Sequence, residues 1–236
     1  MSNTCFRFKQ FTVQQSGAAM KVNTDGVLLG AWTPAEQPGR ALDVGAGTGV
    51  IALMLAQRNA RLLIDAVEID AASVRQAAAN VQQSPWSARI QVIHTSFQQF
   101  AQAAAARYQF IVSNPPYFVN ALQPTNEKRL ITRHAATLPY AALLDGAATL
   151  LAPGGRLSVI LPCVEGELFV AQAAAAGFYC TQKTAVYAVA GKPPKRLLLL
   201  FAREPAPLRE SSLVIRLSHG AGYTPEYKSL TGAFYL

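Results

Sequence analysis

From residue 40 onward, short apolar runs of strand length alternate with segments of helical periodicity. The apolar runs cover 40–44, 62–68, 89–94, 108–113 and 156–161, and the helical segments cover 48–58, 71–83, 97–106, 140–151 and 165–176. Two longer strands follow at about 178–189 and 195–202, joined by an Ala-Gly-Lys-Pro-Pro turn. This alternation is typical of βαβ units, so it predicts an α/β fold with a mostly parallel sheet and helices on both faces.

The length of 236 residues favours one domain rather than two. We expect residues 40–202 to form its core, with extensions at 1–39 and 203–236. The second extension holds a strand-like run at 213–217 and a short helical pattern in which Tyr227, Leu230 and Phe234 share a face. Because 51% of the residues are hydrophobic and 14% are charged, the chain has enough apolar surface for a large core and is not of the disordered class.

The sequence carries no sign of export or membrane insertion. No apolar run approaches the roughly 18–20 residues that span a bilayer, and the first residues, MSNTCFRFKQF, resemble neither a signal peptide nor a transit peptide. Three cysteines without CxxC spacing argue against a disulfide framework and against a cysteine zinc site. We therefore expect a cytoplasmic protein, and we expect it to be a monomer.

The positive charge is distributed unevenly along the chain. The net charge is +8, but residues 41–118 hold five basic and four acidic side chains, whereas residues 181–236 hold eight basic and three acidic ones. A neutral middle with a basic carboxyl-terminal part suggests a polyanionic partner such as nucleic acid, although a solubilising surface would have the same composition.

A glycine-rich turn separates the first strand of the core from its first helix. Gly45, Gly47 and Gly49 follow Asp43 in LDVGAGTGV, and such glycines let a ligand lie against bare main chain. The spacing is G-x-G-x-G, and Val50 breaks the G-x-G-x-x-G pattern of dinucleotide-binding proteins. The turn alone is weak support for a nucleoside-containing cofactor.

An acidic residue at the end of the second strand strengthens that hypothesis. Glu68 lies in VEID, where a parallel sheet places it beside the glycine turn. A carboxylate at this position accepts hydrogen bonds from two ribose hydroxyls, although an acid before a helix also favours the helix dipole. We assign this second, structural role to Asp70, as the N-cap of the following helix.

The sequence NPPY follows the fourth strand at the carboxyl edge of the predicted sheet. The Asn114 side chain and the Pro115 carbonyl can accept both N–H bonds of an exocyclic amine, which turns the nitrogen lone pair toward a methyl donor. Pro116 stiffens the backbone, and Tyr117 offers a flat face on which a base stacks. A simple turn leaving a strand is the structural alternative.

The run LDVGAGTGVIAL…VEID…NPPY resembles the class I S-adenosylmethionine-dependent methyltransferases over about residues 40–202. The resemblance implies a Rossmann-like, seven-stranded sheet with an antiparallel hairpin in its last two strands. It also implies that the glycine turn meets the methionine end of the cofactor and that Glu68 holds its ribose. Many adenine-methylating members carry an acid where this chain has Ser96, which implies a weaker contact to the cofactor's adenine, and Phe97 would pack on that ring. The predicted cofactor-binding residues are Thr24, Asp25, Asp43, Gly45, Gly47, Gly49, Glu68, Ile69, Ser96, Phe97 and Asn114.

By resemblance, NPPY marks enzymes that methylate planar nitrogens: adenine N6, guanine N2 or a glutamine amide. The flanks VNTDGVLLGAW (22–32) and YTPEYKSLTGAFYL (223–236) resemble the family of bacterial tRNA(Val) adenine-N6 methyltransferases, which act beside the anticodon. That resemblance favours tRNA as substrate and places Thr24 and Asp25 near the cofactor, where they are equally well read as a helix N-cap. A methyltransferase acting on a protein glutamine or on guanine N2 of ribosomal RNA stays open, as does an RNA-binding module without activity.

Basic residues in two connections are candidates for phosphate contacts. They are Lys128, Arg129 and Arg133 in the long connection 118–137, and Lys192, Lys195 and Arg196 around the last hairpin turn. The aromatic residues Tyr223, Tyr227, Phe234 and Tyr235 would either stack bases or, at helical spacing, belong to the core. The histidines His94, His134 and His219 lack metal-ligand spacing, so no metal site is expected.

Overall fold

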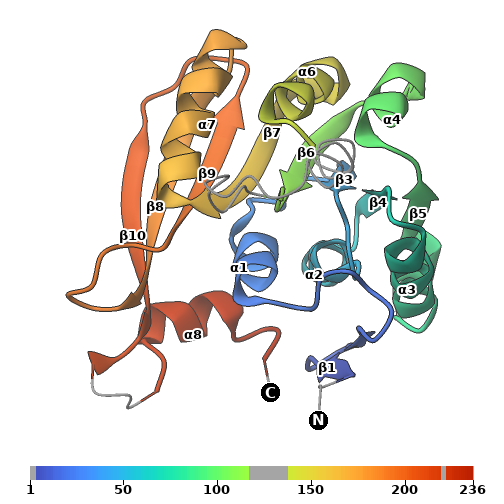
Figure 1. Ribbon diagram of the computed structural model, residues 1–236, viewed down its shortest axis with the longest axis horizontal. Coiled ribbons are helices and arrows are strands. Elements are labelled where there is room, and N and C mark those ends of the chain that lie inside the picture. The colour runs from blue at the N-terminus through green and yellow to red at the C-terminus, as the bar shows by residue number, and fades with distance from the viewer. Residues whose placement is uncertain (1–3, 117–137, 219–221, 236) are drawn as a thin grey trace, which may run out of the picture.

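The computed structural model describes residues 4–116, 138–218 and 222–235. Its helices and strands, shown in Figure 1, are β1 (Cys5–Arg7), β2 (Thr12–Gln14), α1 (Thr24–Trp32), β3 (Gly39–Val44), α2 (Val50–Arg58), β4 (Leu62–Glu68), α3 (Ala71–Gln82), the 3-10 turn η1 (Ser87–Arg89), β5 (Ile90–His94), α4 (Phe97–Ala103), β6 (Tyr108–Ser113), α6 (Tyr140–Leu150), β7 (Leu151–Pro162), α7 (Cys163–Ala175), β8 (Tyr179–Val189), β9 (Arg196–Ala202), β10 (Arg209–Arg216) and α8 (Pro225–Thr231).

The central sheet of the described residues has eight strands in the order β10-β8-β9-β7-β6-β3-β4-β5. Strand β9 runs antiparallel to both β7 and β8, whereas every other neighbouring pair is parallel. Seven strands therefore point the same way, and the carboxyl ends of β3, β4, β6, β8 and β10 all reach one edge of the sheet. Ligands of open α/β sheets bind at this edge.

Helices cover both faces of the sheet, as Figure 1 shows. Apolar residues of α1, α2, α3 and α8 form one core cluster with one face, and those of α4, α6 and α7 form a second cluster with the other. The strands β3, β6 and β7 contribute side chains to both clusters, in keeping with the continuous apolar runs of a sheet buried on two sides.

The predicted α/β fold is confirmed, including the seven strands of the core and the antiparallel insertion. Strand β10 is an eighth, which pairs with β8 in parallel from Arg209 to Arg216 and covers what would otherwise be an exposed edge. Gly177 follows α7 with φ of 75°, as expected of a C-cap glycine. Phe234 lies beyond the end of α8, although the sequence pattern placed it on that helix, and it is still buried.

For two elements near the amino end the sequence predicts no residue range; it indicates only a helix start at Thr24 or Asp25, and the N-cap is the neighbouring Asn23. Helix α1 is buried on six consecutive residues, from Gly26 to Ala31, so it lacks the one-sided apolar pattern that marks a surface helix. The β1–β2 hairpin has only three residues in each strand. The division of the chain into a core and two extensions of one domain stays a prediction.

Candidate functional site

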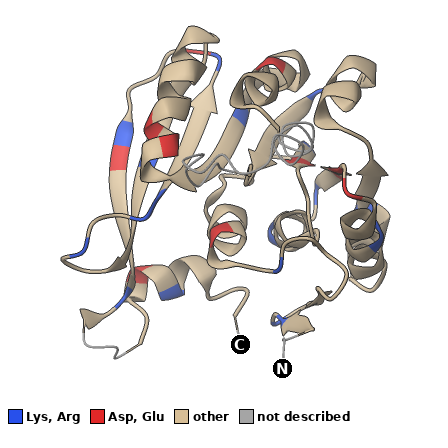
Figure 2. Cartoon of the chain, viewed as in Figure 1, with Lys and Arg blue, Asp and Glu red and all other residues tan. Residues whose placement is uncertain are grey.

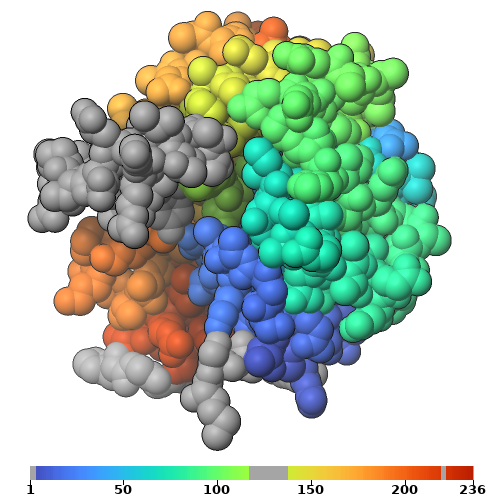
Figure 3. Space-filling view, turned by 45° about the vertical axis from the view of Figure 1, so that its right-hand side comes forward, coloured from blue at the N-terminus to red at the C-terminus, as the bar shows by residue number. Residues whose placement is uncertain are grey.

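A cavity of about 750 Å³ lies at the carboxyl edge of the sheet, where β3, β4 and β6 end. Figure 3 shows this side of the molecule, with the amino-terminal segment and the segments that follow β4 and β6 converging on a hollow. Its lining comes from some of the residues in each of the segments 19–26, 44–51, 67–73, 95–98 and 113–116, and from Leu138. Segments that are distant in sequence meet here because parallel strands end side by side.

The glycine turn leaves bare main chain along the wall of this cavity. Gly45 has φ of 75° and Gly47 has φ of 56°, and a Cβ added to either would have no neighbour within 4 Å. The space that their side chains would occupy is therefore open to a ligand and is not filled by another part of the described protein. Gly49 differs, because its added Cβ would meet Ala77 of α3 at 3.4 Å and it does not line the cavity. Gly49 is the N-cap residue of α2, and its lack of a side chain lets α3 pack close to the glycine turn.

Glu68 joins two loops at the mouth of the cavity. One carboxylate oxygen accepts a hydrogen bond from the Gly47 amide at 2.9 Å, and the other accepts from the amides of Ile69 and Asp70, each at 2.8 Å. A carboxylate has about four lone-pair sites, so acceptor capacity remains for a ligand hydroxyl. Glu68 thus both fixes the glycine turn and faces the cavity. Asp70 caps α3 as expected, since its side chain accepts from the Ser73 amide at 2.7 Å.

Asp43 lies behind the glycine turn rather than in the cavity lining. It is fully buried, and its Oδ2 accepts from the Ala52 amide in the first turn of α2 at 3.1 Å. Its Oδ1 is buried without a partner among the described residues. The pKa of Asp43 is raised to about 7, mainly by burial; the Ala52 hydrogen bond lowers it and the nearby charge of Glu68 adds to the rise.

Ser96, Phe97 and Ile69 line the cavity on the side of β4 and β5. Ser96 is the N-cap of α4, and its hydroxyl accepts from the Gln99 amide at 3.2 Å. Phe97 is buried and packs against Gly146 of α6, where an added Cβ would lie 2.4 Å from the ring. Ile69 is 49% exposed, so it presents an apolar surface to anything bound there.

The start of the NPPY motif lies opposite, at the end of β6. Asn114, Pro115 and Pro116 line the same cavity as the glycine turn. The preceding Ser113 donates a hydrogen bond from its hydroxyl to the Val44 carbonyl at 2.9 Å, which holds the end of β6 against the end of β3. Tyr117 lies outside the described residues.

The segment before α1 and the start of this helix form one side of the cavity. The residues Asn23, Thr24 and Asp25 differ in where their side chains lie. Asn23 is the N-cap, since its side chain accepts from the Gly26 amide at 2.9 Å, and it lines the cavity. Thr24 lines a neighbouring cavity instead. Asp25 forms an ion pair with Arg196, with the carboxylate 2.7 Å from Nε, so both side chains face each other across 171 residues of sequence.

The remaining basic candidates lie in two places. Lys192 and Lys195 are exposed on the turn between β8 and β9, where Figure 2 shows basic residues. Lys128, Arg129 and Arg133 fall outside the described residues. The sequence reasoning missed Met20 and Lys21, which line the cavity; the only signal for them was their position before a good N-cap.

The cavity therefore unites bare main chain, a fixed carboxylate, an aromatic wall and an Asn-Pro segment. A match to a family described as the methyltransferase small domain covers residues 20–165, which is the part of the chain that builds this cavity. The chain belongs to the methyltransferase small domain family.

Known proteins similar to this family member extend the match to its whole length. The tRNA1(Val) (adenine(37)-N6)-methyltransferase of Tolumonas auensis is 45% identical over 237 residues, covering 100% of this chain and 98% of that protein. A predicted O-methyltransferase from Agrobacterium tumefaciens has a similar structure, with a TM-score of 0.71 at 20% identity, covering 89% of this chain and 96% of that one. A glycopeptide N-methyltransferase solved with S-adenosyl-L-methionine has a TM-score of 0.56 at 13% identity, covering 78% and 100%. The two structures support the fold.

The described residues contain neither a membrane-spanning helix nor a metal-binding group. None of the helices there has the length and apolar character needed to span a membrane. In the same parts of the chain, no three His, Cys, Asp or Glu side chains are grouped so as to hold a metal ion.

Proposed function

We propose that this protein transfers the methyl group of S-adenosylmethionine to the N6 amine of an adenine in tRNA, the adenine beside the anticodon of tRNA(Val). The observation that carries the proposal is one cavity lined by Gly45, Gly47, Glu68 and Asn114. The name of the full-length relative supplies the base and the RNA, since that protein is a tRNA1(Val) (adenine(37)-N6)-methyltransferase.

The residues of the cavity fit S-adenosylmethionine. Its volume of about 750 Å³ lies within the range of small-molecule sites. Gly45 and Gly47 would receive the methionine part, Glu68 the ribose hydroxyls, and Ser96 with Phe97 the adenine. Bound there, S-adenosylmethionine supplies an electrophilic methyl group on a sulfonium centre, and the sulfur keeps the bonding electron pair when the methyl leaves. Thr24, Asp25, Asp43 and Gly49 lie outside the lining of this cavity, so we assign them no direct contact.

Asn114 and Pro115 prepare the target amine. The lone pair of an exocyclic amine is delocalised into the base, which makes the nitrogen a poor nucleophile. Acceptance of one N–H by Asn114 Oδ1 and of the other by the Pro115 carbonyl favours a tetrahedral nitrogen with its lone pair on one side. Positioning of this kind supplies most of the rate. The nitrogen is cationic and strongly acidic once it has gained the methyl group, so it loses its proton to water and no strong general base is needed.

The adenine must leave its stack to reach Asn114. Bases in RNA loops are the least costly to unstack, which fits an anticodon loop as target. We propose that Tyr117 stacks on the extruded base and that Lys192 and Lys195, with Lys128, Arg129 and Arg133, contact phosphates. Arg196 is paired with Asp25, so we assign it first to holding the β9 end against α1. A tRNA substrate also implies a cytoplasmic location, and the monomeric state stays a prediction.

Mass spectrometry of nucleosides tests the proposal. Purified protein is incubated with S-adenosylmethionine and unmodified bulk tRNA, and the digested RNA is searched for N6-methyladenosine. We expect this nucleoside with the wild-type protein and none with Asn114→Ala. Production of N2-methylguanosine, or of no methylated nucleoside by protein that binds S-adenosylmethionine, would contradict the proposal and favour ribosomal RNA or a protein glutamine as substrate.

A further inference from the structure

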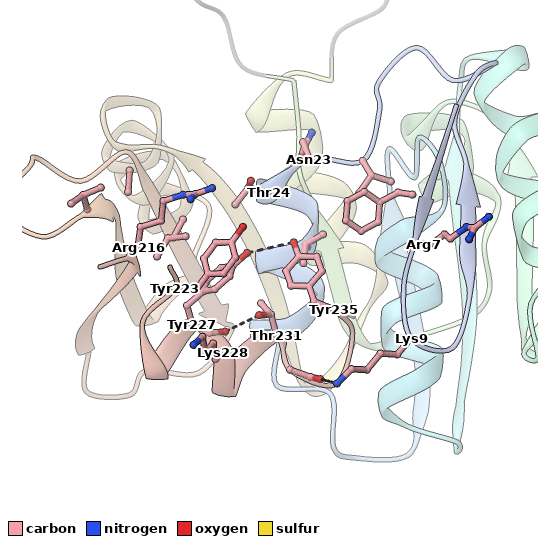
Figure 4. Close-up of a pocket in the computed structure, with 17 residues that line it drawn as sticks. Arg7, Lys9, Asn23, Thr24, Arg216, Tyr223, Tyr227, Lys228, Thr231 and Tyr235 are labelled. Atoms are coloured by element: carbon pink, nitrogen blue, oxygen red, sulfur yellow. Dashed lines mark hydrogen bonds between the residues drawn. The ribbon is translucent and has the colours of Figure 1, made fainter. Parts of the chain in front are cut away.

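A second cavity of about 940 Å³ lies at the same edge of the sheet, where β8 and β10 end. It is bordered by the start of α1, by α8 and by the β1 segment, as Figure 4 shows. Its residues come from five stretches of the chain, within 6–9, 22–27, 188–189, 215–216 and 223–235, and the proposed reaction uses none of them.

The charged residues that line this second cavity are all basic. They are Arg7, Lys9, Arg216 and Lys228, and the lining holds no aspartate or glutamate. Lys9 donates to the Gly232 carbonyl at 2.7 Å. The other three are exposed, and none of the ion pairs in the described part of the chain involves them. Their charge is therefore available to an anion.

An aromatic platform lies among these charges. Tyr223 is 38% exposed and stacks on the buried Tyr227, with ring centroids 4.9 Å apart. The Arg216 guanidinium lies 5.0 Å from the centroid of the Tyr223 ring, and the two residues form a backbone bridge. In Figure 4 the Arg216 head group extends toward Thr24, and Arg7 and Lys9 lie on the opposite side of the cavity. A planar group that enters here meets an aromatic ring and a guanidinium, the two surfaces on which unpaired bases stack in proteins.

The second cavity adjoins the first. Asn23 lines both, Lys21 lines the first and Val22 lines the second. Residues 21–24 thus form a ridge between the two cavities. A strand of RNA that places one base at Asn114 has the second cavity as a neighbour across this ridge.

We propose that the second cavity binds a nucleotide of the RNA that flanks the methylated adenine. Its base stacks on Tyr223 and Arg216, and its phosphates lie near Arg216 and Lys228. This inference rests on the proposed function, because it names how the same substrate is held. The cavity is large enough for one nucleotide, and exposed basic residues around a fixed aromatic ring suit a single-stranded polyanion rather than an apolar or cationic ligand.

Three variants of the full-length protein test the proposal with an RNA hairpin that contains the anticodon loop. Tyr223→Ala should weaken RNA binding and raise KM for RNA by about tenfold, with no change in Kd for S-adenosylmethionine. Tyr223→Phe retains the ring and should behave as the wild type, which separates stacking from folding. Lys228→Gln should reduce the slope of log Kd against log salt by about one.

Matched controls come from the opposite end of the same two strands. Tyr179 at the start of β8 is 47% exposed, and Arg209 at the start of β10 is exposed. Tyr179→Ala and Arg209→Gln should leave RNA affinity and turnover unchanged.

The outcomes separate this inference from the proposed function. If the wild type forms N6-methyladenosine but Tyr223→Ala and Lys228→Gln match it in RNA affinity and KM, the second-cavity inference alone is overturned. If the wild type forms no N6-methyladenosine, yet Tyr223→Ala weakens RNA binding and Tyr179→Ala does not, the cavity binds RNA and the proposed reaction is wrong. A wild type that binds no RNA overturns both.

Discussion

The two cavities at the carboxyl edge of the sheet share Asn23 but differ in charge. The first is lined by the acids Glu68 and Asp70 and one base, Lys21, whereas the second is lined by four bases and no acid. Most of the first cavity is built by motifs within residues 42–116, with the segment before α1 on one side, whereas the second is built by segments near both ends of the chain.

This difference matches the charges of the proposed ligands. S-adenosylmethionine has a sulfonium and an ammonium group against one carboxylate, so it is a net cation, whereas RNA is a polyanion. One sheet edge therefore offers separate sites of suitable sign for each substrate, and Arg216 and Lys228 of the basic carboxyl-terminal part line the second of them. If the two cavities bind different ligands, substitutions in the first should alter methyl transfer or cofactor affinity, and substitutions in the second should alter RNA affinity.

The largest effect is expected at Asn114. Asn114→Ala removes an acceptor for the target amine, so kcat should fall by roughly 10²–10³-fold, comparable with loss of one positioned hydrogen bond in a transition state. Calorimetry should show unchanged affinity for S-adenosylmethionine. Asn114→Asp keeps an acceptor oxygen and should retain more activity than the alanine variant. Near-normal turnover by Asn114→Ala would remove its assigned role.

A second prediction concerns the buried acid behind the first cavity. The pKa of Asp43 is raised to about 7 in the folded protein, so between pH 4 and 7 the folded state binds a proton that the unfolded chain releases. The contribution of Asp43 to the free energy of unfolding is therefore fully present at low pH, below its unfolded pKa, and is lost as the pH rises through 7. Asp43→Asn lacks this dependence.

Urea unfolding at pH 4.5 and 7.5 tests whether the contribution of Asp43 to the free energy of unfolding falls as the pH rises. Relative to Asp43→Asn, the wild type should lose about 2–4 kcal/mol of unfolding free energy on going to the higher pH. Other titrating groups cancel in the difference between the two proteins. Parallel pH profiles would show that Asp43 is ionised throughout, and the first cavity would then have a third negative charge beneath it.

A smaller effect, on affinity for S-adenosylmethionine, is expected from a substitution in the glycine turn. Gly47→Ala places a methyl group in the open space of the first cavity, so Kd for S-adenosylmethionine should rise about tenfold or more. The variant also strains the backbone, because an alanine with positive φ costs about 1–2 kcal/mol. Gly154→Ala is the matched control, since Gly154 has φ of 71°, no neighbour within 4 Å and a position outside the cavity. Equal cofactor affinity in the two variants would contradict the assignment of the turn.

The smallest effect is expected at Ser96. Ser96→Asp keeps an N-cap for α4 and adds a carboxylate to the first cavity, so binding of S-adenosylmethionine should tighten by roughly threefold to tenfold. Ser96→Asn keeps the cap without the charge and should leave the affinity near that of the wild type. Equal or weaker binding by the aspartate variant would place the cofactor's adenine elsewhere.

Much of the first cavity could be predicted from the sequence, because its motifs follow neighbouring parallel strands. Gly45 and Asn114 come directly after β3 and β6, and Glu68 is the last residue of β4, so the topology alone brings them together. The contacts of Asp25 could not be predicted, because its partner Arg196 is 171 residues away and no local pattern joins them. Helix α1 was missed since burial on all sides removes helical periodicity.

The second cavity could not be predicted from the sequence either, because it depends on contacts between residues that are far apart in the chain. Among the carboxyl-terminal aromatic residues, Tyr227 and Phe234 are core whereas Tyr223 is exposed, and spacing alone does not separate these roles. The bridge between Arg216 and Tyr223 is local, but the cavity around it forms only because β10 pairs with β8 and because Lys9, near the amino end, donates to the Gly232 carbonyl, near the carboxyl end.

Methylation of defined transcripts tests the central claim most directly. Two tRNA(Val) transcripts, one with adenine and one with guanine at position 37, are each incubated with the protein and methyl-labelled S-adenosylmethionine. The account predicts about one methyl group per adenine transcript, recovered as N6-methyladenosine, and none on the guanine transcript. Equal labelling of both transcripts, or labelling of neither by protein that binds the cofactor, would contradict it.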